Sequence, residues 1–236
     1  MKIQPFGDSA LIVTFEKVIS EATNQKVIAV YNALKSEKRI LYLIPAYNSL
    51  TIGLKVEQWS LSSASVSIQK TIDQLSTPEL TVVGRTYTIP VCYEAPFDLD
   101  SNDVCEQTNL SKKELIEIHS SQTFRVYMLG FVAGFAYMGS LPNHLACKRK
   151  ATPRLRVPKG SVGLAGLQTG IYPTEAPGGW QIIGQTPLRM FDGNRPETSL
   201  LRPGDHVRFR PIGHDEFKII QLKIETGIFE MEEAHA

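Results

Sequence analysis

Residues 152–173 read TPRLRVPKGSVGLAGLQTGIYP, and this stretch decides how the second half of the chain is expected to fold. Pro153 and Pro158 hold its first part extended, and the glycine-rich run 160–166 follows directly. Frequent glycine and proline are typical of short strands joined by turns. The same texture begins near residue 84 and continues almost to the C-terminus, and it predicts a β-barrel-like domain.

Outward from this stretch, six short apolar runs bounded by turn residues are predicted strands. They are residues 126–131, 160–167, 180–184, 189–191, 206–211 and 217–224. One short helix is expected to begin at Ser111, where Glu114 completes a capping box, and to lead to His119.

The first third of the chain alternates strands and helices. Ser20 is expected to cap one helix, and an apolar stripe over 64–75 predicts a second helix that Thr77-Pro78 stops. The predicted strands are residues 10–15, 40–46 and 50–56, the last two forming a hairpin. Pairing of residues 85–91 back onto these strands would give the ferredoxin-like split βαβ order.

The predicted fold class is therefore α+β, in two domains. Residues 1–84 are expected to form a ferredoxin-like domain, and residues 85–236 a β-barrel. The length of 236 residues suits two modest domains.

Charge and hydropathy exclude several function classes. Lys plus Arg number 25 against 24 Asp plus Glu, with no long block of one sign, so neither nucleic acid nor an anionic membrane is an expected partner. The N-terminus lacks the apolar core of a signal peptide, and the most apolar window, residues 128–139, is shorter than the roughly 20 residues that a bilayer requires. A cytoplasmic protein is expected.

The three cysteines, Cys92, Cys105 and Cys147, are widely spaced and form no C-x-x-C motif. No pair of histidines accompanies them at the spacing of metal ligands. Neither a disulfide nor a metal site is predicted.

Five cations lie within eleven residues, from Arg149 to Lys159. In an extended segment Arg154 and Arg156 share a face, which suits a clamp on one carboxylate or phosphate. The alternative is a solvated edge strand whose charges oppose aggregation. No Walker A or G-x-G-x-x-G motif follows, so the chain has no standard phosphate cradle for ATP.

Two further segments are candidate ligand sites. The stretch LGFVAGFAYMG, residues 129–139, is either a tight barrel corner or a loop that lines a ligand. Gln168 to Trp180 gathers an amide, hydroxyls and an indole, which together orient small polar molecules. Taken singly, each of these residues is more often structural.

His119 is a candidate acid, base or orienting donor, with a helix-capping role as the alternative. Asp98, Asp100 and Asp103 are expected to lie in a solvated loop. No nucleophile stands beside a recognisable base, so the sequence shows no self-contained catalytic machinery.

Several long motifs carry a resemblance to a known family. They are LGFVAGFAYMG, TPRLRVPKGSVGLAGLQTGIYP, PGGWQIIGQTPLRMFD and RPGDHVRF, with weaker agreement at GDSALIVTF and ELIEIHSSQTFRVYMLGF. The chain resembles the family of allophanate hydrolase subunit 1, the kinase inhibitor KipI and the B subunit of 5-oxoprolinase, of the carboxyltransferase domain, subdomain C and D type. The resemblance implies a ferredoxin-like domain followed by a cyclophilin-like β-barrel.

By this resemblance the chain is one component of an ATP-dependent 5-oxoprolinase, which hydrolyses 5-oxo-L-proline to L-glutamate. The implied partners are a second cyclophilin-like protein, of the type of KipA or the C subunit of 5-oxoprolinase, and the catalytic A subunit. The chain alone is expected to be inactive. The family also implies two alternatives, inhibition of a sensor histidine kinase and a carboxyltransferase or allophanate hydrolase role.

The resemblance also assigns roles to residues. Arg154, Gln168 and Tyr172 are expected to orient the substrate, and His119 to act in catalysis beside the loop at Gly134. Two departures from the family stand out: Ala133 replaces a usual proline, and Glu94-Ala95 replaces a usual Gly-Gly. The remaining motif positions, of which Phe135, Arg156 and Trp180 are also assigned to substrate binding, are Gly130, Phe131, Phe135, Tyr137, Arg156, Gly160, Ser161, Gly166, Thr169, Gly170, Pro173, Gly178, Gly179 and Trp180.

Overall fold

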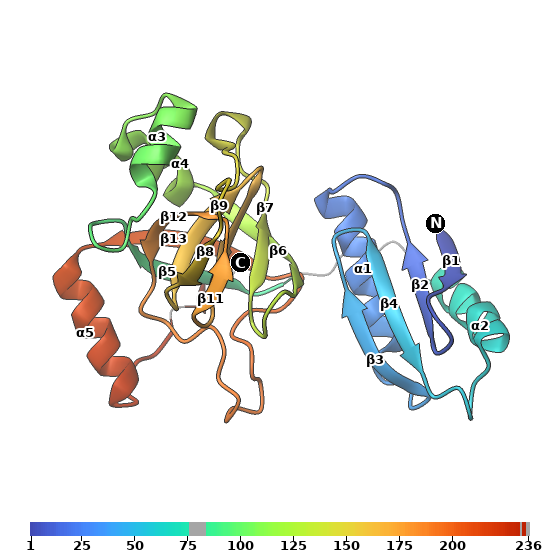
Figure 1. Ribbon diagram of the computed structural model, residues 1–236. Coiled ribbons are helices and arrows are strands. Elements are labelled where there is room, and N and C mark those ends of the chain that lie inside the picture. The colour runs from blue at the N-terminus through green and yellow to red at the C-terminus, as the bar shows by residue number, and fades with distance from the viewer. Residues whose placement is uncertain (76–83, 232, 235–236) are drawn as a thin grey trace. The chain divides into compact units, whose positions relative to one another are not determined.

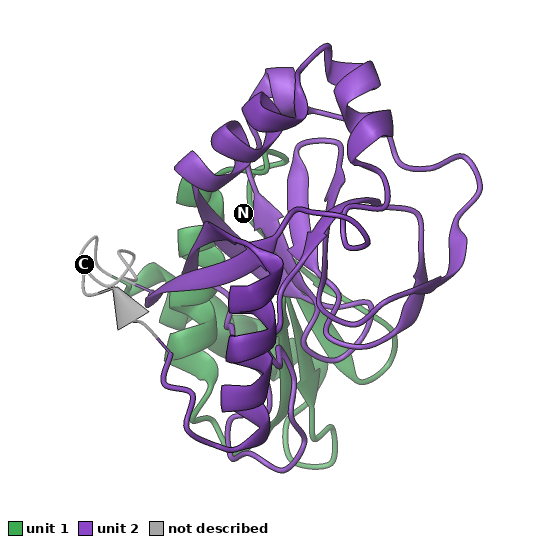
Figure 2. Cartoon of the chain, turned by 90° about the vertical axis from the view of Figure 1, so that its left-hand side faces the viewer, with its two compact units in different colours: residues 1–83 green, residues 84–236 purple. Residues whose placement is uncertain are grey.

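The computed structural model describes residues 1–75, 84–231 and 233–234, and the chain divides into two compact units, residues 1–83 and 84–236 (Figure 2). The first unit is an antiparallel sheet with two helices (Figure 1). The strands lie in the order β1-β2-β4-β3. Their bounds are β1 (Lys2–Pro5), β2 (Ala10–Thr14), β3 (Ile40–Pro45) and β4 (Ser49–Leu54), and the helices are α1 (Glu21–Leu34) and α2 (Leu61–Asp73).

Serine caps begin both helices of this unit. The hydroxyl of Ser20 accepts a hydrogen bond from the backbone N–H of Thr23 at 3.2 Å, and Ser60 accepts one from Ser63 in α2. The predicted helices and hairpin are confirmed, although α2 ends at Asp73 and the predicted stop, Thr77-Pro78, lies outside the described residues.

The expected pairing of residues 85–91 with the first sheet is wrong. These residues lie in β5 (Thr86–Cys92), which pairs with strands of the second unit. The place beside β2 is taken by β1 from the N-terminus, in antiparallel register with Ile3 opposite Val13. Strand β5 has buried side chains along most of its length, which suits the middle of a barrel wall better than a sheet edge.

The second unit is a closed seven-stranded barrel, in the order β12-β9-β10-β7-β6-β13-β5, with β12 meeting β5 again. Strand β14 adds to β5, and β8 and β11 form a separate pair. The chain is thus α+β with a β-barrel, as predicted. The bounds are β6 (Thr123–Leu129), β7 (Ala136–Gly139), β8 (Arg154–Val157), β9 (Ser161–Ala165), β10 (Gln168–Ile171), β11 (Ala176–Gly178), β12 (Gln181–Gln185), β13 (His206–Ile212) and β14 (Glu233–Ala234).

Helices cover one end and one side of the barrel (Figure 1). The capping box at Ser111 begins α4 as predicted. The prediction of a strand over 217–224 is wrong, because this segment lies within a helix whose Phe217 and Ile220 are buried at helical spacing. Residues 189–191 form no strand either, and Phe191 makes a single bridge to Ser199. The helices are α3 (Ser101–Thr108), α4 (Lys112–Ser121) and α5 (His214–Glu225), with a 3-10 turn at Asn143–Leu145.

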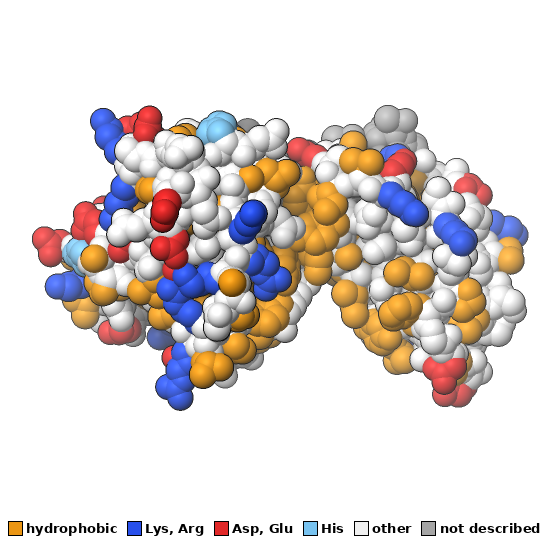
Figure 3. Space-filling model, turned by 45° about the horizontal axis from the view of Figure 1, so that its top comes forward, with side chains coloured by type: hydrophobic (Ala, Val, Ile, Leu, Met, Phe, Trp, Pro, Cys, Tyr) orange, Lys and Arg blue, Asp and Glu red, His pale blue; other side chains and the backbone are white. Residues whose placement is uncertain are grey.

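Each unit has its own buried core. Figure 3 shows Lys and Arg interspersed with Asp and Glu on the face that it presents, which fits the near-neutral net charge. Within the described part of the chain, no helix has both the length and the hydrophobicity that crossing a membrane would require.

Candidate functional site

A pocket of about 760 Å³ opens on the barrel beside the end of α3. Its walls come from four places: α3, strand β7, the segment before β8, and the β9–β10 hairpin with the start of β12. The lining residues are Gln107, Tyr137, Ala146, Cys147, Lys148, Arg149, Ala165, Gly166, Gln168 and Trp180.

The β9–β10 hairpin supplies one wall. Its two-residue turn is Gly166-Leu167, and Gly166 has a φ of +59°, which suits the first position of a type II′ turn. The backbone N–H of Gly166 donates to the carbonyl of Cys147 at 2.7 Å. This turn fixes Gln168, which lies opposite Gly139 of β7, at the edge of the pocket.

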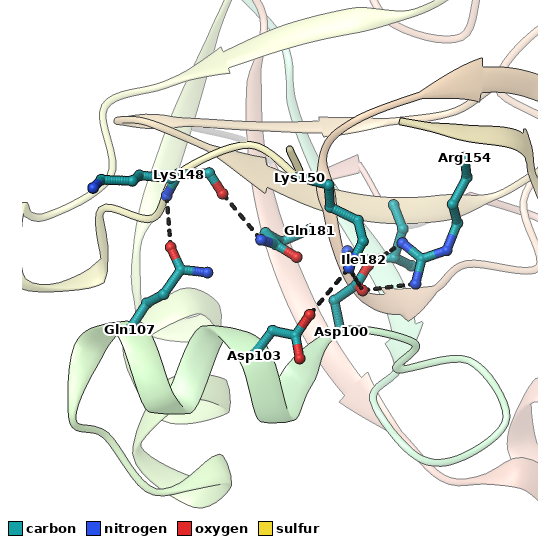
Figure 4. Close-up of polar contacts among 8 residues, drawn as sticks. All are labelled: Asp100, Asp103, Gln107, Lys148, Lys150, Arg154, Gln181 and Ile182. Carbon is teal, nitrogen blue, oxygen red and sulfur yellow. Dashed lines mark hydrogen bonds and ion pairs between the residues drawn. The ribbon is translucent and has the colours of Figure 1, made fainter. Parts of the chain in front are cut away.

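Backbone groups of the basic segment 148–150 are anchored on three sides (Figure 4). The N–H of Lys148 donates to Gln107 of α3 at 2.9 Å, and its carbonyl accepts from the amide of Gln181 at 3.0 Å. The N–H of Lys150 donates to the carbonyl of Gly179 at 2.7 Å. The main chain is therefore held in place, while the Lys148 and Arg149 side chains at the pocket stay exposed.

An aromatic cluster forms the floor. The rings of Tyr137 and Trp180 meet edge to face with centroids 5.8 Å apart, and Phe135 lies 4.7 Å from Tyr137 and 5.1 Å from Tyr172. Gly178 permits this packing, because a Cβ there would overlap the Tyr172 hydroxyl. Phe135 and Tyr172 are almost fully buried, so they support the floor rather than reach the pocket.

The pocket combines exposed cations, side-chain amides and an aromatic wall. Burial raises the pKa of the Tyr137 hydroxyl, which keeps it a neutral hydrogen-bonding group. Burial also raises the pKa of the Cys147 thiol to about 11, so this cysteine is a poor nucleophile at neutral pH. Such a lining suits binding of a small anion that has polar groups and a flat face.

Arg154 lies outside this pocket lining and binds Asp100. Its guanidinium donates to both carboxylate oxygens at 2.6 and 2.7 Å, and Lys150 and the backbone N–H of Ile182 each add a bond of 2.8 Å (Figure 4). Burial raises the pKa of Asp100, but these donors outweigh it and hold the pKa below its ordinary value. Asp100 is thus a buried anchor, and the expectation that it lies in a solvated loop is wrong.

Arg156 points elsewhere. Its side chain is 82% exposed, and its Nε lies 3.6 Å from a carboxylate oxygen of Glu175. The two arginines therefore bind different carboxylates of this chain, and the structure does not bring them together on one anion as expected.

His119 lies in the barrel core, with both ring nitrogens engaged. Nδ1 lies 2.8 Å from the Tyr93 hydroxyl and Nε2 lies 3.0 Å from the Thr169 hydroxyl, while Thr169 donates to the carbonyl of Gly163. All donors are used if Tyr93 donates to Nδ1 and Nε2–H donates to Thr169. Burial lowers the pKa of His119 to about 3, so the ring is neutral. The structure does not bring it to the pocket lining.

Gly134 belongs to a different hollow. The loop at residues 130–134 and the segment near Phe191 line a pocket of about 410 Å³. Gly134 has a φ of +83°, and a Cβ would press on the Phe191 side chain. Of the residues predicted from the sequence for substrate binding, Gln168 and Trp180 meet in the 760 Å³ pocket.

Sequence reasoning did not assign Gln107, Lys148 or Cys147 to a site. Arg149 was visible only as one of five cations in the basic run. Gln107 comes from α3, a helix that the sequence pattern did not reveal, so nothing in the local sequence marks it as a pocket residue.

Comparison with known proteins gives close relatives. The B subunit of 5-oxoprolinase from Bacillus subtilis is 36% identical over 227 residues, covering 92% of this chain and 95% of the relative. The corresponding B subunit from Escherichia coli O157:H7 is 38% identical over 205 residues, covering 87% and 93%.

Among solved structures, TTHA0988 superposes with a TM-score of 0.76 at 32% sequence identity. The match covers 86% of this chain but 40% of that longer chain. The model of the family described as carboxyltransferase domain, subdomain C and D, matches residues 1–201. On this match and on the relatives, the chain belongs to the carboxyltransferase domain, subdomain C and D, family.

Proposed function

We propose that this chain is the B subunit of an ATP-dependent 5-oxoprolinase complex, which opens the lactam of 5-oxo-L-proline to give L-glutamate. Support comes first from relatives of that name that match nearly end to end at 36–38% identity. The observation about this chain that carries the proposal is the pocket where Arg149, Gln168 and Trp180 meet.

The substrate matches the chemistry of this lining. 5-Oxoproline has a carboxylate, which suits the guanidinium of Arg149, since planar donors bind carboxylates in pairs. Its lactam group offers one donor and one acceptor, which suits the side-chain amide of Gln168. Its small ring suits the wall formed by Trp180 and Tyr137. Arg149 thus takes the carboxylate-binding role that the sequence analysis assigned to Arg154.

The chain works in this proposal with two other proteins. A second cyclophilin-like component and the catalytic A subunit complete the complex, in the cytoplasm, and ATP is assigned to the complex rather than to this pocket. The sequence has no standard phosphate cradle, and the described pocket has no nucleophile activated by a base. Kinase inhibition and carboxyl transfer stay as the alternative predictions.

Reconstitution tests the proposal. The three components are combined, and ATP-dependent formation of glutamate from 5-oxoproline is followed. Omission of this chain is expected to abolish turnover. Arg149→Gln is expected to raise KM for 5-oxoproline by about tenfold or more, because a charged hydrogen-bond pair is lost.

Arg189→Gln is the matched control, since Arg189 is also exposed and lines a different pocket. It is expected to leave KM unchanged. Full turnover without this chain would refute the proposal. Unchanged KM in both Arg149→Gln and Gln168→Ala would remove substrate binding from this pocket.

A further inference from the structure

The barrel brings three side chains of metal-ligand type to one of its ends. Strands β5 and β13 run parallel, with Cys92 opposite Ile212 as their last registered pair. The carboxyl ends of parallel strands meet at the same edge of a sheet. Cys92 and Glu94 at the end of β5 therefore lie beside His214, the first residue of α5 after β13.

The ligand atoms of these residues are already close together. The sulfur of Cys92, a carboxylate oxygen of Glu94 and a ring nitrogen of His214 all lie within 4.8 Å of one another. His214 Nδ1 is 2.6 Å from Glu94 Oε2. In a tetrahedral zinc site with bonds of about 2.0–2.3 Å, donor atoms are about 3.5 Å apart. Small rotations of the solvent-accessible Glu94 and His214 side chains are enough to reach that geometry.

The surroundings prepare the thiol and the imidazole for a ligand role. The backbone N–H of Glu94 hydrogen-bonds to the Cys92 thiol, an interaction that stabilises the thiolate. The ring of His214 lies 5.4 Å from the ring of Phe97, which stacks on Phe217 at 4.6 Å. Cys92 is fully buried, whereas Glu94 and His214 face solvent, so a cation has a path of entry on their side.

We propose that Cys92, Glu94 and His214 bind one Zn²⁺ ion. A thiolate, an imidazole and a carboxylate form a mixed donor set that suits zinc better than magnesium or calcium, which prefer oxygen ligands alone. Three protein ligands leave the fourth tetrahedral position for water or another small ligand. The bound ion links the end of β5 to the start of α5. Cysteine spacing predicts no such site, because the ligands come from distant segments.

The test uses the full-length chain, stripped of metal and titrated with Zn²⁺ or with Co²⁺ as a spectroscopic substitute. One equivalent of Co²⁺ is expected to give a thiolate-to-cobalt charge-transfer band and the d–d bands of a tetrahedral site. Zn²⁺ is expected to displace Co²⁺ and to raise the thermal unfolding midpoint. Glu94→Gln and His214→Gln are each expected to weaken Zn²⁺ binding by at least about tenfold.

Cys92→Ser is expected to remove the charge-transfer band, and Cys105→Ser, which changes a cysteine outside the cluster, is expected to keep it. Because Cys92 is buried, Glu94→Gln and His214→Gln serve as variants that leave the core intact. The proposal is overturned by absence of a thiolate band in the folded chain. It is also overturned by a band that persists in folded Cys92→Ser, or by Zn²⁺ affinity that both Glu94→Gln and His214→Gln leave unchanged.

Discussion

At the scale of single residues, Arg154 and Arg156 offer a matched pair of substitutions in one strand. Arg154 binds the buried Asp100, whereas Arg156 is 82% exposed. Arg154→Ala is expected to lower the free energy of unfolding by about 3 kcal/mol, because Asp100 keeps its charge but loses two donors. Arg156→Ala is expected to change it by less than about 0.5 kcal/mol. Urea denaturation measures both, and equal effects would contradict the assignment of Arg154 as an anchor.

His119 makes stability depend on pH. The unfolded chain takes up a proton on this residue below pH of about 6.5, whereas the folded chain does so only near its pKa of about 3. The unfolded state therefore binds more protons in this window, and stability falls as the pH falls, by up to about 1.4 kcal/mol per pH unit. Urea denaturation at pH 5, 6 and 7 measures this slope.

His119→Gln is expected to reduce the slope, although the variant is less stable at every pH. His144→Gln, at an exposed histidine, is expected to keep the slope of the parent chain. A parent slope identical to that of His119→Gln would mean that His119 is protonated equally in both states.

Residue types alone suggested a polar, aromatic site in the barrel, and the structure brings Gln168 and Trp180 to one pocket. The partner of each cation was not visible in the sequence. Asp100 lies far from Arg154 along the chain, and only the fold shows that this carboxylate occupies the arginine. The same limit applies to His119, whose burial depends on strands that surround it from distant segments.

At the scale of elements, helix α4 depends on its capping box. The Ser111 hydroxyl accepts from the N–H of Glu114 at 3.2 Å, and Glu114 accepts from the N–H of Ser111 at 2.8 Å. Ser111→Ala is expected to lower the free energy of unfolding by about 1 kcal/mol. Ser120→Ala, in the last turn of the same helix, is expected to cost less than about 0.5 kcal/mol. Thermal or urea unfolding measures both, and a larger effect at Ser120 would contradict the capping role.

Local signals predicted the elements that have them. Ser20 and Ser111 cap helices, and the hairpin of β3 and β4 forms where expected. Strand and helix were confused at 217–224, where branched apolar residues favour a strand but Phe217 and Ile220 are spaced for a helix. The partner of β5 could not be predicted, because pairing depends on burial across the whole barrel.

At the scale of the whole molecule, each unit has a core of its own. The barrel core contains residues from β5, β6, β9, β12 and β13, together with the helices that cover it. A fragment of residues 84–236 is therefore expected to fold cooperatively by itself. Circular dichroism and a sigmoidal urea transition test this, and a fragment without a cooperative transition would show that the barrel requires residues 1–83.

The barrel wall is not equally strong around its circumference. Strands β5 and β13 share seven registered pairs, whereas β5 and β12 close the ring through the single pair of Cys92 and Gln185. Water and deuterium reach the backbone first where few hydrogen bonds must open. This narrow closure is therefore the place where the cylinder opens during native-state breathing, and a cation held at Cys92 would slow that opening.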